Sequence, residues 1–566
     1  MADLHTTNLC AEIISTHFGP LASKVASALL SRGRLTHPQL VRFTSLKPRL
    51  VRNILLVLIQ QNIVWHANSE TDGSGEEVFE FNTDECLMRL RFGVFVYQAE
   101  ELFGVAGGEI IQLVLDHGKL TSSQILQRLD TGATSLFLSE DKTPFIYSQA
   151  LHKLVSLRYL KPSTISSHIS PRDKRIQYEA EEKAKISGFP TSRQLREAKE
   201  TAEARLNMEE AEAEKIGLKR KAKSQPSMTK KRKATSTKDD DDMVVDETVY
   251  FRVNFDKFNI HTRNALIEKA VQERYNSGAA LVVRAILKIT EETQNSVADS
   301  RTDPLSVSNI ILHLNSDEDE ETLTSGLIQS SSKPMSSGSC IKEYLGILSC
   351  ADNPTSNGRA GAFLEFSTKG GGSGKVQVLF DVIARRLRRQ IVEGVAREKH
   401  GAEGVRVVRL LMDSGKLDEK QISKNVMMPL KDVRPLLSAL SASSLVSIIE
   451  VPKSADRNPT RMFYLWQVDT QKALTHILDI LYKTLYNISA RRRAEREDPM
   501  LVAVLNKRER SDVSVDVEGL LSQHEKEVLK AWEDKEQKLS ILEARVEETV
   551  FIVRESGRAI GSLEDD

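Results

Sequence analysis

The segment RLLMDSGKLDEKQI, residues Arg409–Ile422, has two earlier counterparts: ALLSRGRLTHPQL at Ala28–Leu40 and LVLDHGKLTSSQI at Leu113–Ile125. Each copy is an apolar helical stretch followed by Gly, a basic residue, Leu, and then Thr or Asp. The Gly is expected to end one helix with a positive φ, and the Thr or Asp to cap the next. A repeat of this kind predicts several copies of one structural module.

A third helix is expected in each copy. PRLVRNILLVLIQQNIV (Pro48–Val64) aligns without a gap with KDVRPLLSALSASSLV (Lys431–Val446) in the last copy, counting from the shared Gly. The middle copy, Tyr147–Leu160, fits with an insertion around Ser139–Pro144. Two strand-like runs flanking a polar turn follow, and in the first copy the turn is Asn68–Glu77. Three helices closed by a β-hairpin predict a winged helix, a variant of helix-turn-helix.

A further copy is expected between Val249 and Phe366. Its third helix is predicted at Ile341–Cys350, and GAFLEFST is expected to hold a return strand. The acidic and Ser-rich stretch between residues 315 and 339 reads as a disordered insertion.

The C-terminal part changes pattern at Thr470. Apolar residues recur at three-four and heptad spacing in two stretches joined by a polar, Pro-containing segment, which predicts an antiparallel coiled-coil hairpin. The expected seam is Leu474, Ile477, Leu481, Ile488, Trp532, Leu539, Leu542 and Val546.

The predicted fold class is therefore mainly α with small β wings: tandem winged-helix domains plus a C-terminal antiparallel coiled-coil hairpin. The expected divisions are 1–85 for winged helix 1, 86–176 for winged helix 2, 177–245 for a charged and partly disordered linker, 246–368 for winged helix 3, 376–469 for winged helix 4 and 470–566 for the hairpin.

The linker carries two features. Thr191 and Gln194 predict a capping box at the start of a solvated helix that ends near Ile216. Two basic clusters follow, and they resemble a bipartite nuclear import signal, although a merely solvated linker or a flexible phosphate-binding segment fits the same composition. The import residues are Lys219, Arg220, Lys221, Lys230, Lys231, Arg232 and Lys233.

Composition narrows the functional classes. Lys+Arg and Asp+Glu both number 79, so any contact with nucleic acid must be local. The apolar runs are far too short for a membrane span, and the four cysteines form no C-x-x-C pair. GGGSGK at Gly370–Lys375 lacks the first Gly and the final hydroxyl of a phosphate-binding loop. We therefore expect no catalytic residues, no cofactor, no metal, no small-molecule substrate and no membrane.

Local DNA contacts are expected on the third helices, because this helix enters the major groove in winged-helix proteins. Their cations favour phosphate contacts, which give affinity without sequence choice, although a charged helix face is often only solvated surface. The expected DNA-backbone contacts are Lys47, Arg49, Arg52, Lys431 and Arg434.

With the repeats placed, the chain resembles the RNA polymerase III subunit built of four extended winged helices, a relative of the alpha chain of general transcription factor IIE. The matching stretches are spread in order along the chain and include Leu9–Thr36, Met88–Thr121, Phe251–Val271 and Phe463–Glu497.

The resemblance implies a nuclear, non-catalytic subunit in a three-subunit peripheral subcomplex on the clamp of the largest polymerase subunit. It implies recruitment to the initiation factor and assistance in opening double-stranded promoter DNA, which then becomes melted, at transfer RNA and 5S ribosomal RNA genes. Three alternatives stay open at this point: a stand-alone winged-helix regulator, a winged-helix scaffold of another large complex, and an ATP-driven enzyme using Lys375.

Overall fold

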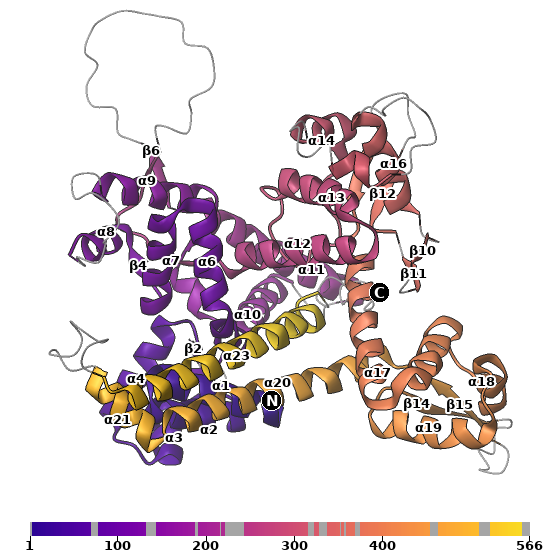
Figure 1. The fold of residues 1–566 in the computed structure, drawn as a ribbon. Coiled ribbons are helices and arrows are strands. Elements are labelled where there is room, and N and C mark those ends of the chain that lie inside the picture. The colour runs from indigo at the N-terminus through magenta and orange to yellow at the C-terminus, as the bar shows by residue number, and fades with distance from the viewer. Residues whose placement is uncertain are drawn as a thin grey trace, which may run out of the picture. The chain divides into compact units, whose positions relative to one another are not determined.

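The computed structural model comprises two compact units, Met1–His261 and Thr262–Asp566, which are described separately below (Figure 1). The described residues are 3–68, 77–131, 143–186, 191–215, 217–220, 243–314, 322–327, 337–350, 353–355, 358–360, 362–367, 374–452, 462–508 and 521–556. None of the helices in these ranges is long and apolar enough to cross a membrane.

The first module is three helices and a wing, preceded by one extra helix. Its elements are α1 (Leu4–Phe18), α2 (Pro20–Arg32), β1 (Leu35–Thr36), α3 (His37–Thr44), α4 (Pro48–Gln60), β2 (Val64–Asn68) and β3 (Glu77–Phe81). The antiparallel sheet has the order β1-β3-β2, with Leu35 opposite Phe79. The buried side of α4 holds Val51, Leu55 and Leu58 against this sheet and the other helices. The predicted wing is confirmed.

The second module repeats this plan with its closing strand far away in the sequence. Its elements are α5 (Thr83–Met88), η1 (Arg89–Arg91), α6 (Phe92–Phe103), α7 (Val105–His117), β4 (Leu120–Thr121), α8 (Ser122–Thr131), α9 (Thr143–Ser156), β5 (Leu160–Pro162) and β8 (Tyr250–Val253). The sheet order is β4-β8-β5. Phe251 is fully buried beside Phe95 in the core of this module. The sequence analysis assigned residues 246–253 to the third module, whereas their strand closes the second.

In the sequence, a pair of helices and a strand pair stand between β5 and β8. After η2 (Ile165–His168), α10 (Pro171–Ala184) packs along α11 (Ser192–Lys215), and β6 (Leu218–Arg220) pairs with β7 (Met243–Val245). The predicted capping box is confirmed, since Thr191 and Gln194 exchange hydrogen bonds. The expected solvated helix buries Ala202 completely, and Arg205 bridges to Glu181 on α10. This part of the predicted linker is therefore a packed hairpin.

The third module starts on α12 (Phe255–Arg274), which runs across the boundary of the two units. It continues through α13 (Ser277–Thr290), β9 (Leu305–Ser306), α14 (Val307–His313), α16 (Ser337–Ser349), β10 (Asn353–Thr355), β11 (Gly358–Ala360), β12 (Leu364–Ser367) and β13 (Lys375–Val378). The predicted third helix and return strand are confirmed as α16 and β12. The sheet order is β12-β13-β9, so β13 closes this module, although the sequence analysis placed residues 376–378 in the fourth.

The fourth module is the last winged helix. It comprises α17 (Phe380–Ser414), α18 (Glu419–Val426), α19 (Leu430–Ala442), β14 (Ser447–Pro452) and β15 (Met462–Gln467). α17 bends at Gly401, whose φ of 69° lies outside the helical region. An isolated antiparallel β-bridge between Leu417 and Trp466 takes the place of the short first strand that the other modules add to their wings. The sequence predicts a turn over PKSADRNPT, residues 452–460; Pro452 ends β14, and residues 453–460 lie outside the described residues.

The predicted repeat is confirmed in backbone detail. Gly33, Gly118 and Gly415 end their helices with φ of 80°, 80° and 76°. The offset that superposes Gly33 on Gly415 also superposes Ser45 on Met427 and Asn62 on Ser444, four non-glycine residues with positive φ. Because positive φ is uncommon outside Gly, this coincidence shows that both modules share one frame. The predicted N-caps are confirmed at Thr36, Thr121 and Asp418.

The C-terminal hairpin consists of α20 (Thr470–Arg496), α21 (Pro499–Arg508) and α23 (Gln523–Arg554). α20 packs along α23 in the antiparallel sense, as Figure 1 shows in orange and yellow. Arg492 bridges to Glu536 and Glu543, and Lys535 bridges to Glu495.

Candidate protein and nucleic-acid interfaces

The third helix of the first module presents cations at its beginning. Pro48 occupies the first turn of α4, where its missing N–H costs nothing, and Lys47 precedes it. Lys47, Arg49 and Arg52 are all exposed. None of the three makes an ion pair with a described residue. The structure thus brings these sequence-predicted residues together on one accessible helix end.

The third helix of the last module is differently charged. Lys431 is exposed at the start of α19. Arg434, the counterpart of Arg52, places Nε 3.0 Å from Oε2 of Glu419 on α18. The Arg434 side chain is 67% exposed, so this pair is weak and easily exchanged for another anion.

A cleft that the sequence analysis did not predict lies beside α4. It has a volume of about 440 Å³ and is lined by Thr36, His37, Pro38, Arg52, Leu55, Leu56, Ile59, Glu77 and Phe79. Leu56 is 60% exposed and the neighbouring Val57 is 48% exposed. The uninterrupted apolar run Ile54–Ile59 was the available signal, because one buried helix face does not require six consecutive apolar residues.

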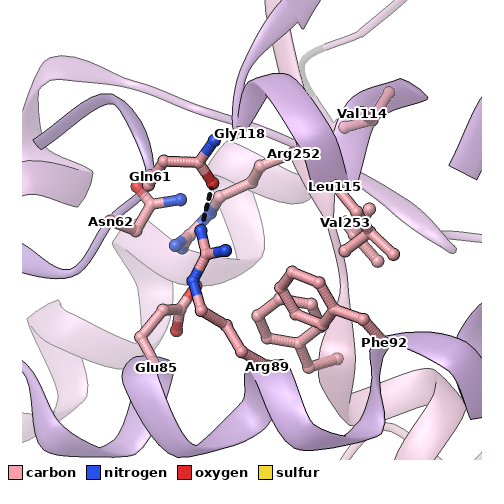
Figure 2. Close-up of a pocket in the computed structure, with 11 residues that line it drawn as sticks. Gln61, Asn62, Glu85, Arg89, Phe92, Val114, Leu115, Gly118, Arg252 and Val253 are labelled. Atoms are coloured by element: carbon pink, nitrogen blue, oxygen red, sulfur yellow. Dashed lines mark hydrogen bonds between the residues drawn. The ribbon is translucent and has the colours of Figure 1, made fainter. Parts of the chain in front are cut away.

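A second, interior cavity joins the first and second modules (Figure 2). Arg89 donates a hydrogen bond of 2.6 Å to the amide oxygen of Gln61, and the guanidinium of Arg252 points to the same place. Burial raises the pKa of Glu85, and burial lowers the pKa of Arg89 to about 10. The cavity measures about 20 Å³, which is room for roughly one water and too small for a ligand. We therefore interpret its lining residues as packing between the first and second modules.

Lys119 of the second module also contacts the first module, where its Nζ donates to the backbone oxygen of Ile59. Its Nζ lies 3.2 Å from the ring nitrogens of His168, and His168 stacks on His66. Burial, followed by repulsion from Arg252, lowers the pKa of Lys119 to about 8. Burial, followed by repulsion from Lys119, lowers the pKa of His168 to about 4. Sequence spacing could not reveal this cluster, because its members come from distant segments.

The import-like segment is described only at its start. Lys219 lies on β6, and its Nζ is 2.7 Å from Oδ2 of Asp246, which lowers the pKa of that carboxyl group to about 2. Arg220 also lies on β6. Lys221, Lys230, Lys231, Arg232 and Lys233 lie outside the described residues.

The predicted coiled-coil seam is partly displaced. Leu474 and Ile477 are buried, but they pack into the core of the fourth module. Leu481 is half-buried against the same core, and Ile488 is buried. Trp532, Leu539 and Val546 are half-buried.

The predicted seam is wrong at Leu542, because this residue is 45% exposed. The neighbouring Glu543 faces α20 instead, where Arg492 binds it. On α20 the buried residues that the prediction missed are Ala473, Tyr482 and Leu485.

Within the part of the chain that the structure describes, no three His, Cys, Asp or Glu side chains gather as metal ligands would. Lys375 lies at the start of β13, while the glycines Gly370–Gly372 lie outside the described residues.

Comparison with known proteins gives three family matches in chain order. Residues 8–68 match the RNA polymerase III subunit RPC82 helix-turn-helix domain, residues 149–355 match RNA polymerase III subunit RPC82, and residues 392–468 match the POLR3C C-terminal winged-helix domain.

Whole-chain relatives agree with these matches. The chain is 24% identical to DNA-directed RNA polymerase III subunit RPC3 of Danio rerio, covering 96% of this chain and 97% of the relative. It is 25% identical to the Bos taurus protein of the same name over the same shares, and 26% identical to the Aspergillus clavatus protein over 98% and 100%. The chain belongs to the family of winged-helix subunits of RNA polymerase III.

Proposed function

We propose that this chain is a non-catalytic, nuclear subunit of a three-subunit peripheral subcomplex of RNA polymerase III. In this role it binds the clamp of the largest subunit, recruits the enzyme to its initiation factor, and assists opening of promoter DNA at transfer RNA and 5S ribosomal RNA genes. The observation that carries the proposal is the order of the family matches along a chain of winged helices, a fold that offers several separate docking faces.

We propose DNA-backbone contacts at the beginnings of two third helices. Lys47 and Arg49 start α4, and Lys431 and Arg434 start α19. Arg434 can leave Glu419 for a phosphate at small cost, because both groups reach solvent. On α19 the exposed residues that follow, Ser438 and Ala439, are small and do not obstruct a groove.

The module boundaries also remain a proposal. Four winged helices fit the structure when the second is extended to include β8 and the third to include β13. The basic segment follows β6 and precedes β7 in the sequence, and we propose it as a nuclear import signal.

The proposal is tested by reconstituting transcription with polymerase III depleted of this subunit. We expect the depleted enzyme to extend RNA on a tailed template, since catalysis resides in other chains, but to fail on a closed transfer RNA promoter. Adding the full-length protein should restore initiation, and a promoter with a premelted bubble should reduce the requirement.

Two results would overturn the proposal. One is full promoter activity without this chain. The other is tight, sequence-specific binding of a duplex by the isolated protein with no effect on the polymerase, which would favour a stand-alone regulator.

A further inference from the structure

We propose that the first winged helix docks an amphipathic helix from another polymerase III subunit. The apolar side of that helix fills the cleft beside α4, and a carboxylate of the helix faces Arg52. The inference rests on the chain being a polymerase subunit, and it names a partner chemistry for one surface.

The cleft has the chemistry of an unfilled protein interface. Pro38, Ile59 and Phe79 form an apolar lining, and Leu56 and Val57 expose large side chains beside it. An exposed apolar surface with a polar rim is typical of a protein-binding site.

The last module shows that the apolar surface is not required by the fold. At the counterparts of Leu56 and Val57 it carries Ser438 and Ala439, although Leu55 and its counterpart Leu437 are both buried. Folding therefore needs Leu at the inner position and tolerates small residues outside. Packing within the first module therefore does not explain why Leu56 and Val57 are large and apolar, whereas binding of a partner does.

Charge and shape select the occupant. The cleft lining holds one arginine, Arg52, and one carboxylate, Glu77, and Arg52 pairs with no described carboxylate. Between Arg52 and Ile59 the lining follows two turns of α4, ~10 Å of groove. A helix with anchors at positions i, i+3 or i+4 and i+7 matches this length, and an acidic residue placed at Arg52 would complement that cation.

Nucleic acid fits this surface less well. DNA binding depends on neutralising phosphates and reading polar base edges, and Leu56 and Val57 do neither well. Lys47 and Arg49 can still meet DNA at the open end of α4, while the cleft itself is assigned to protein.

Crosslinking in the assembled enzyme tests the assignment. Full-length protein with the photocrosslinker p-benzoylphenylalanine in place of Val57 is assembled into purified polymerase III on promoter DNA and irradiated. We expect crosslinks to an amphipathic, acidic segment of another subunit, located by mass spectrometry. Crosslinks mainly to DNA, or to this chain alone, would overturn the proposal.

A matched pair of variants measures the contribution. Leu56→Asp should lower the affinity of the full-length protein for the remaining polymerase subunits by at least about tenfold, because it replaces an apolar side chain of the cleft by a charge and offers Arg52, four residues earlier on α4, a carboxylate within this chain. Ser438→Asp, at the equivalent position of the last module, should leave that affinity unchanged. Equal losses for both variants, or no loss for Leu56→Asp, would contradict the assignment.

The folding of both variants is checked by their thermal unfolding, which should match the parent because both sites are exposed. A parent protein that assembles through this cleft but fails to restore promoter initiation would overturn the proposed function and leave the docking site standing.

Discussion

The first and last winged helices share their buried residues and backbone turns but differ on their exposed faces. Val51, Leu55 and Leu58 of α4 have buried counterparts in Val433, Leu437 and Leu440 of α19. On the outer side, α4 carries exposed Leu56 and two arginines that pair with no described carboxylate, whereas α19 carries Ser438 and an arginine paired with Glu419. Packing constrains the inside of both modules in the same way and leaves their exposed faces free to differ.

The largest expected effect tests the shared frame. Leu55→Ala and Leu437→Ala each remove a buried side chain from the same position, and each should destabilise its module by about 2–5 kcal/mol. Hydrogen exchange of α4 and α19 in the full chain measures the two losses separately. A loss below about 1 kcal/mol in only one module would break the equivalence.

A second test distinguishes the glycines of the repeat. Gly118→Ala places a Cβ 2.4 Å from the backbone oxygen of Gln60 and also strains a positive φ, so we expect a loss of about 3 kcal/mol. Gly415→Ala meets open space and should cost only about 1 kcal/mol of conformational strain. Chemical denaturation compares the variants, and equal costs would show that Gly118 is not a close contact between the first two modules.

A third test uses pH, because the first module contacts the second through a histidine cluster. The folded-state pKa of His168 is about 4, below its ordinary value of 6.5, so the unfolded chain takes up the proton first. Stability should therefore fall as the pH drops from 6.5 to about 4, by about 1 kcal/mol after allowance for solvent screening.

The variant His168→Gln isolates this contribution. It should flatten the pH dependence of hydrogen exchange in the second module and leave that of the last module unchanged. An unaltered pH dependence would contradict the assigned role of His168.

The smallest expected effect concerns the paired arginine of the last module. Arg434→Ala removes an exposed ion pair with Glu419 and should change stability by less than about 0.5 kcal/mol. Thermal unfolding of the full chain, compared with that of Arg52→Ala, measures the difference. A large loss for Arg434→Ala alone would show that the pair is structural and not available to DNA.

The sequence predicted what local chemistry dictates. The helix-ending glycines, the capping residues Thr36 and Asp418 and the wing strands of the first and last modules follow from short patterns, and these are confirmed. β8 and β13 were assigned to the wrong modules because each strand follows an insertion, and local patterns do not report which sheet a strand joins.

The candidate sites were harder to predict. The sequence predicted the cations of α4 as a group. It could not predict the cleft beside them, because α3, α4 and β3 line that cleft together and come from separate segments. The seam prediction was wrong at Leu542, which is exposed, while the neighbouring Glu543 lies toward α20 and pairs with Arg492. The cluster around Glu85 combines residues from both ends of the first unit, and periodicity gives no sign of it.

The most direct test of the central claim is purification of the tagged full-length protein from nuclear extract at moderate salt, with identification of the chains that accompany it. Our account predicts stoichiometric recovery of the large polymerase III subunits, with marked loss for Leu56→Asp and none for Ser438→Asp. Recovery of the intact protein without any polymerase subunit would contradict the account.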